Sequence, residues 1–278
     1  MKQILVPVDL SGLSEKAYRL AADVAAKLNM GITLLHVVPA SGEILVDVTG
    51  NLIETEDFDT SAIKARIAES CSTLAGWKSW YPAIKVEART RPGQAEEVIL
   101  NELKQSDQYQ LIVMATHGAT GMKEFFIGSH TEHIAMKSKV PLLSIKDTEK
   151  DLSRVVFASS FSGVMPVPAF FGQLCEALQA DVTFLHIQTP SEATDKQVIE
   201  SNMEKTAAAC GISLRSKVIF AAQQVEEGIE QFTTAHQAGL LVLESKGRTG
   251  LSRWVAGCVS ADLINHYEHA LLTYKRSG

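Results

Sequence analysis

Glycines and a serine follow a buried-type run in the first half of the chain, with a spacing that could hold phosphate. Leu111–Met114 is followed by Gly118 and, after nine further residues, by Gly128 and Ser129. Glycine lets a ligand approach the backbone closely because it has no Cβ. Ser129 begins a predicted helix, and the free N–H groups at a helix N-terminus favour anions. The pattern therefore indicates a phosphate site, with Ser129 and the N–H of His130 as hydrogen-bond donors.

The same residues also fit a purely structural role. Ser129, His130, Thr131 and Glu132 match the S-x-x-E capping box, which needs no ligand. The Glu132 carboxylate would also oppose an incoming phosphate. On spacing alone, both interpretations stay open.

The glycine spacing recurs 129 residues later, at Gly247 and Gly257. A repeat at about half of the 278-residue length indicates two copies of one domain, which agrees with the domain count expected for this length. We predict one domain over residues 1–147 and a second over 152–278, joined by a short charged linker.

The second copy departs from the first where phosphate would bind. Glu244 stands at the end of the apolar run Leu240–Leu243, and a carboxylate there would repel phosphate. Cys258 replaces the serine and is a weak hydrogen-bond donor. Lys246 and Arg248 are interpreted as a solvated face of the loop. We expect no ATP in this copy and a structural or pairing role, and an unrelated apolar or acyl ligand stays open.

Strands and helices alternate along both copies. Ile4–Val8 is a short apolar run typical of a buried parallel strand. Helical periodicity follows from Ser11 to Met30, with Ser14 as the predicted N-cap and Gly31 as the helix end. The first copy is further predicted to hold strands at 32–38, 84–90, 110–114 and 141–146 and helices at 61–75, 94–104 and 129–137; the second is predicted to hold strands at 154–158, 181–187, 213–220, 239–243 and 270–275.

This alternation predicts an α/β fold of two tandem, doubly wound, mostly parallel five-stranded sheets with helices on both faces. In such sheets, ligands bind outside the carboxyl ends of the strands, where the strand order reverses. Residues 40–60 interrupt the pattern with a long acidic segment, interpreted as a solvated loop or hairpin, with a lid or partner-binding arm as the alternative.

Composition and charge exclude several classes of protein. A hydrophobic content of 46% and a charged content of 21% are ordinary for a soluble globular protein. The net charge of −6 argues against a nucleic-acid partner, and no apolar run reaches the ~20 residues of a membrane span. The chain lacks a signal-peptide pattern, and its four isolated cysteines are expected to be free buried thiols in the cytoplasm.

Histidines do not form a convincing metal site. His130 and His133 have i, i+3 spacing, as does a second pair near the C-terminus, but neither pair has an obvious third ligand. We therefore predict no metal site. His36 and His186 occupy equivalent places in the second strand of each copy and are expected to be hydrogen-bonded core residues.

Together these motifs resemble the universal stress protein family over essentially the whole chain, as two tandem copies. That family has a first strand ending in Pro-x-Asp, a second strand reading roughly Leu-Leu-His-Val, and Gly-x-x-Gly followed after nine residues by Gly-Ser/Thr. This sequence has Pro7–Asp9, Leu34–Val37, Gly118 and Gly128–Ser129 at those places.

The resemblance implies an ATP site in the N-terminal domain. In nucleotide-binding members of the family, the glycine motif serves the ribose and phosphates of ATP. The family's first glycine is Ala115 here, and whether its methyl group obstructs a ligand depends on the local backbone angle. Carried over position by position, the resemblance places Pro7, Val8, Asp9 and Val37 at the adenosine end, Met114, Ala115 and Gly118 at the floor of the loop, and Gly128, Ser129 and His130 at the phosphates.

The resemblance further implies an adenine nucleotide α-hydrolase-like fold and a cytoplasmic stress-response or regulatory protein that binds ATP, with Mg²⁺ accompanying the nucleotide. Pairing between the last strands would make the two copies an internal pseudo-dimer, and two chains would form a homodimer. A nucleotide-free scaffold or chaperone-like module is the alternative, and a slow ATP hydrolase is a weaker one. No catalytic base and no Walker motif can be named in the sequence.

Overall fold

The computed structural model describes residues 1–39, 61–116, 129–146, 151–191, 194–245, 267 and 269–275. The acidic segment at 40–60 and both glycine-rich loops lie outside these residues, so the hairpin predicted in the former stays a prediction.

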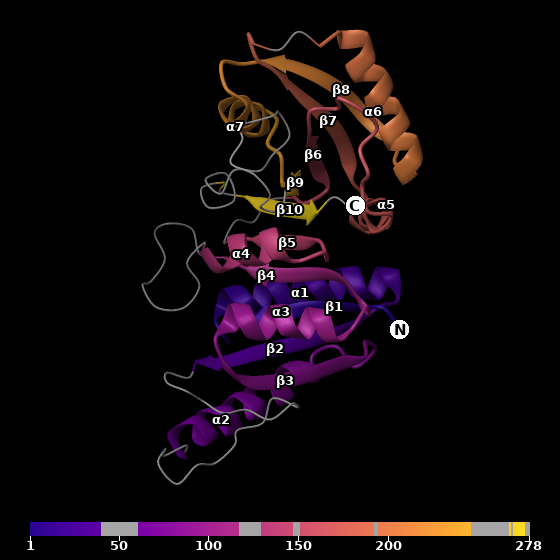
Figure 1. The fold of residues 1–278 in the computed structure, drawn as a ribbon. Coiled ribbons are helices and arrows are strands. Elements are labelled where there is room, and N and C mark those ends of the chain that lie inside the picture. The colour runs from indigo at the N-terminus through magenta and orange to yellow at the C-terminus, as the bar shows by residue number, and fades with distance from the viewer. Residues whose placement is uncertain are drawn as a thin grey trace.

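The first half of the molecule is a parallel sheet with helices on both faces (Figure 1). Its strand order is β3-β2-β1-β4-β5, and all neighbouring strands are parallel. The strands are β1 (Gln3–Val8), β2 (Gly31–Pro39), β3 (Val86–Gly93), β4 (Tyr109–Ala115) and β5 (Leu142–Ile145), and the helices are α1 (Gly12–Leu28), α2 (Ser61–Lys78), α3 (Ala95–Gln105) and α4 (Ser129–Lys137).

The second half repeats this strand order as β10-β9-β6-β7-β8, again with parallel neighbours. Its strands are β6 (Arg154–Ala158), β7 (Asp181–Gln188), β8 (Leu214–Ala221), β9 (Leu240–Ser245) and β10 (Ala270–Lys275), and its described helices are α5 (Phe170–Leu178), α6 (Lys196–Cys210) and α7 (Val225–Ala235). The predicted α/β fold class is confirmed.

The two halves join through their last strands. β5 pairs antiparallel with β10, with Leu271 opposite Ser144 and Thr273 opposite Leu142. The pairing predicted between the last strands is confirmed, and it merges the two five-stranded sheets into one sheet of ten strands, which the sequence analysis treated as separate. Pairing covers the edge that each half would otherwise expose at this strand.

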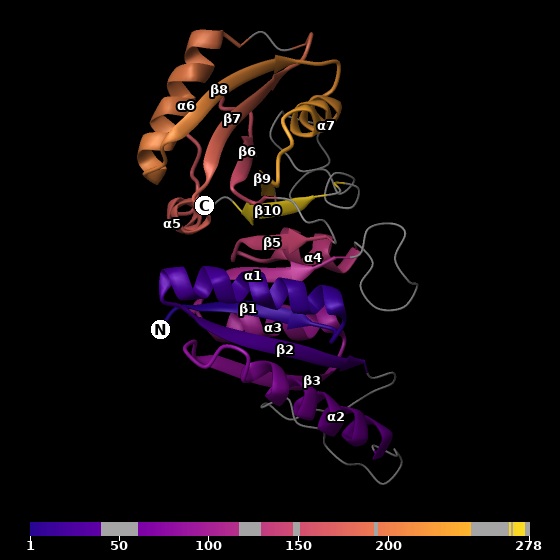
Figure 2. The same ribbon diagram turned by 180° about the vertical axis from the view of Figure 1, so that it is seen from behind.

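Alternating side chains send two apolar layers to opposite faces of the sheet. Ile4 and Val6 belong to a buried cluster that includes residues of α1, α2, α5 and α6, whereas Leu5 belongs to a second cluster that includes residues of α3, α4 and α7. Figure 2, seen from behind, shows α1 and α2 in front of the strands that α3 covers in Figure 1. Strand residues with period two therefore fill both layers, as expected for a sheet buried on both faces.

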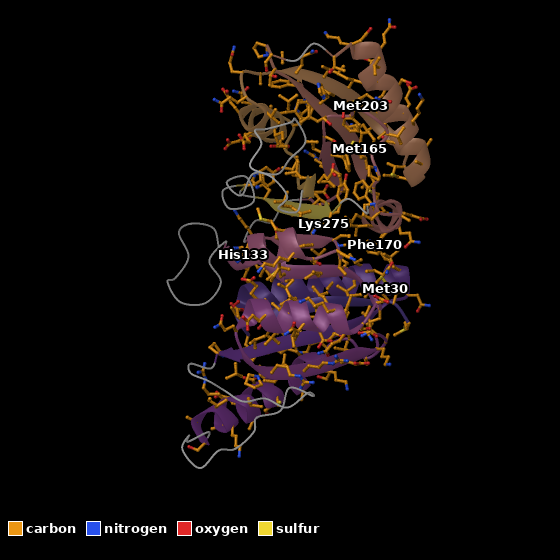
Figure 3. The ribbon with its side chains drawn as sticks, viewed as in Figure 1. Met30, His133, Met165, Phe170, Met203 and Lys275 are labelled. Atoms are coloured by element: carbon orange, nitrogen blue, oxygen red, sulfur yellow. The ribbon has the colours of Figure 1, made fainter. Side chains whose placement is uncertain are left out.

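The first layer also connects the halves. The Lys27 ammonium group, near the end of α1, donates a hydrogen bond of 2.6 Å to the carbonyl oxygen of Ala177 in α5. Met30 and Phe170, labelled in Figure 3, come from opposite halves and belong to the same buried cluster. The halves thus share helix contacts as well as strand pairing.

The predicted ends of α1 were wrong. Ser11, not Ser14, is the N-cap, because the Ser11 side chain accepts a hydrogen bond from the N–H of Ser14. The helix ends at Asn29, which adopts the left-handed conformation (φ 51°), and Gly31 is the first residue of β2. Asparagine tolerates this conformation better than most residues, so it can replace glycine at a helix end.

Candidate functional site

The turn between β1 and α1 is organised around the carboxylate of Asp9. One oxygen, Oδ1, accepts hydrogen bonds from the Ser11 N–H (3.0 Å), from the Ser11 hydroxyl (2.5 Å) and from the Ser14 hydroxyl. The Asp9 N–H in turn donates to Ser14 Oγ at 3.0 Å. Asp9 is therefore held from both its side chain and its backbone. Among the described residues, all hydrogen bonds to the carboxylate end on Oδ1, which leaves Oδ2 for a ligand.

These contacts favour the ionised form of Asp9. Burial by itself would raise the pKa of the carboxyl group. The hydrogen bonds from Ser11 and Ser14 and from nearby backbone amides outweigh this effect and hold the pKa below its usual value. At neutral pH the turn therefore presents a fixed carboxylate.

Leu10 adopts a left-handed backbone conformation (φ 65°), which is uncommon for a non-glycine residue. Phe161, which follows β6 as Leu10 follows β1, does the same (φ 45°). Strained residues persist where their surroundings over-determine them. In the first half the bonds from Asp9 to Ser11 and Ser14 supply that constraint.

The described residues predicted at the adenosine end, and Met114 of the predicted loop floor, lie at one edge of the sheet but not on one face. Pro7, Val8 and Val37 are buried at the carboxyl ends of β1 and β2, and Met114 is buried in β4. Val8 belongs to the α1 side of the sheet, whereas Val37 and Met114 belong to the α3 side. Met114 is only 1% exposed, so its side chain fills the core and only its backbone can border a cleft.

Ala115 has an ordinary strand backbone. It ends β4, pairs with Ile145, and is absent from the described non-glycine residues with positive φ. No glycine is therefore required here for conformational reasons, which answers half of the question raised by the sequence. The other half of the question is whether the Ala115 methyl group, on a half-buried residue, takes space that a ligand would need.

His36 supports the same edge from β2. Its Nδ1 lies 2.8 Å from the carbonyl oxygen of Val8, which confirms the predicted hydrogen-bonded histidine. Burial lowers the pKa of the imidazole, although the Val8 carbonyl and Asp9 act in the opposite direction. The ring is therefore neutral at pH 7, donates through Nδ1 and fixes the end of β1 next to Asp9.

The predicted phosphate-binding residues are only partly described. Gly118 and Gly128 lie outside the described residues. Ser129 and His130 are the first two residues of α4, and the structure describes their backbone but not their side chains. Because α4 follows β4 and precedes β5, its N-terminus faces the carboxyl edge that carries Asp9.

Glu96 in α3 anchors α4 by two contacts. Its carboxylate oxygens lie 2.8 Å from Nδ1 of His133 and 2.6 Å from Nζ of Lys137. His133 is thus engaged with a carboxylate on a neighbouring helix. Within the described ranges, no three His, Cys, Asp or Glu side chains come together in a way that could hold a metal ion.

In the second half, the corresponding edge carries a row of buried polar side chains. Glu244 in β9 pairs in register with Tyr274 in β10. Ser159, one residue beyond β6, donates its N–H to Leu185, next to His186 in β7. All four polar residues are buried, at 0% exposure for His186 and 3% for Glu244.

The first half places smaller or apolar residues in the same row, namely Val8, Ala115 and Ile145 beside the shared histidine. The exchange of Ala115 for Glu244 replaces a methyl group by a buried carboxyl group. In addition, Phe161 is fully buried, and its ring centroid lies 5.1 Å from that of Phe184. Both rings belong to the cluster on the α1 and α5 side of the sheet. Side chains thus fill the second half where the first half presents Asp9.

Ser11 and Ser14 complete the Asp9 network, which the sequence alone does not predict, since Ser14 fits a helix cap there. The spacing Asp9-x-Ser11 matches an Asx-type turn before a helix and could have signalled this network. The expectation that all cysteines are buried was also wrong for Cys71, which is exposed on α2.

The comparison with known families agrees with the duplicated fold. The model of the universal stress protein family matches residues 1–146 and 169–275. The chain belongs to the universal stress protein family. The two matched segments correspond to a tandem arrangement, and the unmatched stretch between them includes β6 and the turn that carries Phe161.

Curated relatives match about half of the chain. A universal stress protein of Mycolicibacterium smegmatis is 29% identical over 143 residues, which are 51% of this chain and 45% of that protein. One of Methanocaldococcus jannaschii is 26% identical over 154 residues, or 52% of this chain and 94% of that protein. The chain thus spans about half the length of the longer curated relatives that it matches.

Solved structures reproduce the whole two-half fold. A universal stress protein from Archaeoglobus fulgidus superposes with a TM-score of 0.67 at 18% identity, covering 99% of this chain and 96% of the other. A functionally unknown protein of Pseudomonas aeruginosa gives 0.57 at 14% identity, covering 99% and 93%. At these identities the likeness concerns the fold alone. Among the helices described here, none combines the length and apolar character needed to span a bilayer.

Proposed function

We propose that the first half binds an adenine nucleotide, with ATP as its main ligand, at the carboxyl edge of β1, β2 and β4. The observation that carries this proposal is the Asp9 turn. Its carboxylate is ionised and held through Oδ1, and Oδ2 accepts no hydrogen bond from the described residues. A carboxylate oxygen held in this way can accept hydrogen bonds from the ribose hydroxyls.

The site lies where ligands bind in this class of sheet. β1 is followed in sequence by β2 on one side and is flanked by β4 on the other, so the strand order reverses beside Asp9. Pro7, Val8 and Val37 would border the adenosine through the strand ends, and the backbone of Met114 and Ala115 would form the floor.

The phosphates would extend toward α4. Gly118 and Gly128 would let them approach the backbone, and Ser129 and His130 would supply donors at the N-terminus of the helix. Mg²⁺ would be held through the phosphate oxygens. Glu96, by anchoring α4 through Lys137, would keep this N-terminus in place.

The second half would serve as a structural partner rather than as a second nucleotide site. Glu244 is buried where Ala115 borders the proposed site, and Ser160 follows β6 where Asp9 follows β1. A polyanion there would meet a carboxyl group and would lack the ribose acceptor. The whole would act as a cytoplasmic stress-response regulator whose nucleotide occupancy alters its partner surface, and two chains would associate as a homodimer.

Calorimetric titration of the full chain with ATP and Mg²⁺ tests the proposal. Asp9→Asn keeps an oxygen for Ser11 and Ser14 but removes the charge. The loss of a charge-assisted hydrogen bond, roughly 1.5–3 kcal/mol, should weaken ATP binding about tenfold to a hundredfold. Asp23→Asn, an exposed position on α1, is the matched control and should leave affinity unchanged.

The same proteins should be compared by melting temperature with and without nucleotide. ATP at about 100 times its Kd should add roughly 2.7 kcal/mol of apparent stability to the wild type. A wild-type protein with neither heat of binding nor a melting shift would favour the nucleotide-free scaffold instead. Equal ATP affinity in Asp9→Asn would remove Asp9 from the site.

A further inference from the structure

A tyrosine fills the amino end of the sheet in the first half. Tyr109, at the start of β4, is 3% exposed and lies on the α3 side of the sheet. Its hydroxyl donates to Glu102 Oε1 at 2.6 Å and lies 3.4 Å from Thr33 Oγ1. Glu102 also accepts a hydrogen bond of 2.5 Å from Arg89. Ring, hydroxyl and carboxylate together occupy this space.

The second half has an alanine in the same place. Leu111 pairs with Ile4 as Leu240 pairs with Val155, so Tyr109 corresponds to Ala238, 129 residues later. Ala238 is also buried, at 1% exposure, and belongs to the same side of the sheet. The second half therefore has no ring at the place that the Tyr109 ring fills in the first half.

A cavity of about 280 Å³ occupies this place. We call it the Ala238 pocket. A cavity of roughly 150 Å³ in another protein accommodates benzene, so this one has room for a ring with a substituent. His236, the C-cap residue of α7, lines the Ala238 pocket. The residues that bear on its chemistry are Val156, Ala238, Thr183, Ser216, Arg154 and Arg215.

The pocket is apolar on one side and carries hydroxyls on another. Val156 and Ala238 are its apolar lining residues, at 4% and 1% exposure. Thr183, which corresponds to Thr33 of the first half, lies with its hydroxyl 3.0 Å from that of Ser216. Either hydroxyl can turn to donate a hydrogen bond to a ligand oxygen.

The rim of the pocket is positively charged. Arg154 donates through Nη1 to Gln237 at 2.8 Å, which leaves its other guanidinium donors for a ligand. Arg215 pairs with Asp181 at 2.5 Å, but both side chains are more than half exposed, so this ion pair can open at little cost. Two guanidinium groups face one carboxylate here, in a chain whose net charge is −6.

We propose that the Ala238 pocket binds a ring-sized organic anion, of the class of monocyclic aromatic carboxylates. The ring would take the space that the Tyr109 ring fills in the first half, against Val156 and Ala238. The carboxylate would meet Arg154 and the hydroxyls of Thr183 and Ser216. Guanidinium groups bind carboxylates through paired N–H donors, so they select this head group over a neutral one. The proposal is independent of the nucleotide site.

Ligand-observed NMR and calorimetry on the full chain test the proposal, with benzoate and 4-hydroxybenzoate as probes. Benzyl alcohol has the ring without the charge, and inorganic phosphate has the charge without the ring. Ala238→Tyr restores the first-half residue and should lower benzoate affinity at least tenfold by filling the pocket. Arg154→Gln introduces the glutamine that the first half has at the corresponding position, Gln3. It should reduce benzoate affinity to that of benzyl alcohol and leave the affinity for benzyl alcohol nearly unchanged.

Melting curves establish whether both variants are folded. If Ala238→Tyr does not fold, the benzoate affinity of Arg154→Gln, a change at the exposed rim, tests the proposal by itself. Binding of benzoate that both folded variants weaken supports the proposal. No binding of either carboxylate at about 10 mM, where even a weak site of this size would be partly filled, overturns it. Unchanged benzoate binding in a folded variant, or phosphate binding as tightly as benzoate, also overturns it.

Discussion

Removal of the Ser14 hydroxyl should destabilise the first half in a way that depends on pH. Ser14 is 2% exposed, and its hydroxyl donates to the Asp9 carboxylate and accepts the Asp9 N–H at 3.0 Å. A hydrogen bond to a charged group is worth about 1.5–3 kcal/mol. Ser14→Ala should therefore lower the free energy of unfolding by about 2 kcal/mol at pH 7.

The sign of the pH dependence follows from the lowered pKa of Asp9. A carboxyl group whose pKa is lower in the folded state stabilises that state above its unfolded pKa, which is about 3.9. This contribution is lost as the pH falls through the folded value. Ser14→Ala removes a bond that favours the ionised form, so its cost should be full at pH 7 and smaller at pH 3.

Urea unfolding at both pH values measures the effect, with Ser70→Ala as the matched control. Ser70 is also a largely buried helical serine, but its hydroxyl donates to the backbone oxygen of Arg66 rather than to a carboxylate. Its replacement should cost about 1 kcal/mol or less, equally at both pH values. If Ser14→Ala costs no more than Ser70→Ala, or if its cost is the same at pH 3 and pH 7, the Asp9 network does not hold the turn.

Two further outcomes are expected. Gly239→Ala should lower the free energy of unfolding by about 3 kcal/mol, because the added Cβ would overlap the backbone oxygen of Asp151. Gly76→Ala is the control and should be neutral or stabilising, because a Cβ there would meet no atom within 4 Å. Equal urea midpoints for the two variants would contradict this prediction. At pH 8, iodoacetamide should modify exposed Cys71 long before Cys175, because burial raises the pKa of Cys175 to about 12. Mass spectrometry that finds equal labelling rates would show Cys175 to be accessible.

The elements were predictable from the sequence because they are long and strongly patterned. The apolar runs at β6 and β10 and the capping pattern at the start of α4 gave their observed bounds. The end of α1 was misjudged because glycine is the commonest residue after a helix, and Asn29 takes that role here. The join at β5 and β10 came from the family resemblance, since strand pairing is not visible in local sequence.

The candidate site was predictable where a motif carries it and not where packing decides it. Asp9 stands out as the acidic residue that follows an apolar strand. The roles of Ser11 and Ser14 depend on the turn that brings their hydroxyls to one oxygen. The Ala238 pocket required the structure, because the alignment of Tyr109 with Ala238 shows a lost side chain but not whether neighbours move in to fill its place.

The two halves use one topology but carry different side chains at both ends of the sheet. In the first half, Tyr109 and Glu102 occupy the place that corresponds to Ala238, with a separate cavity of about 400 Å³ between Tyr109, the end of α3 and the end of α4, and the carboxyl end presents Asp9. In the second half, Phe161 and Glu244 are buried at the carboxyl end, and a cavity of about 280 Å³ at the amino end has the buried Ala238 in its lining. If topology alone fixed where these sheets take ligands, corresponding places in the two halves would carry similar side chains. A few side-chain exchanges alter both ends of the sheet while the strand order stays the same, so we expect side-chain volume and charge, together with topology, to decide where each half binds a ligand.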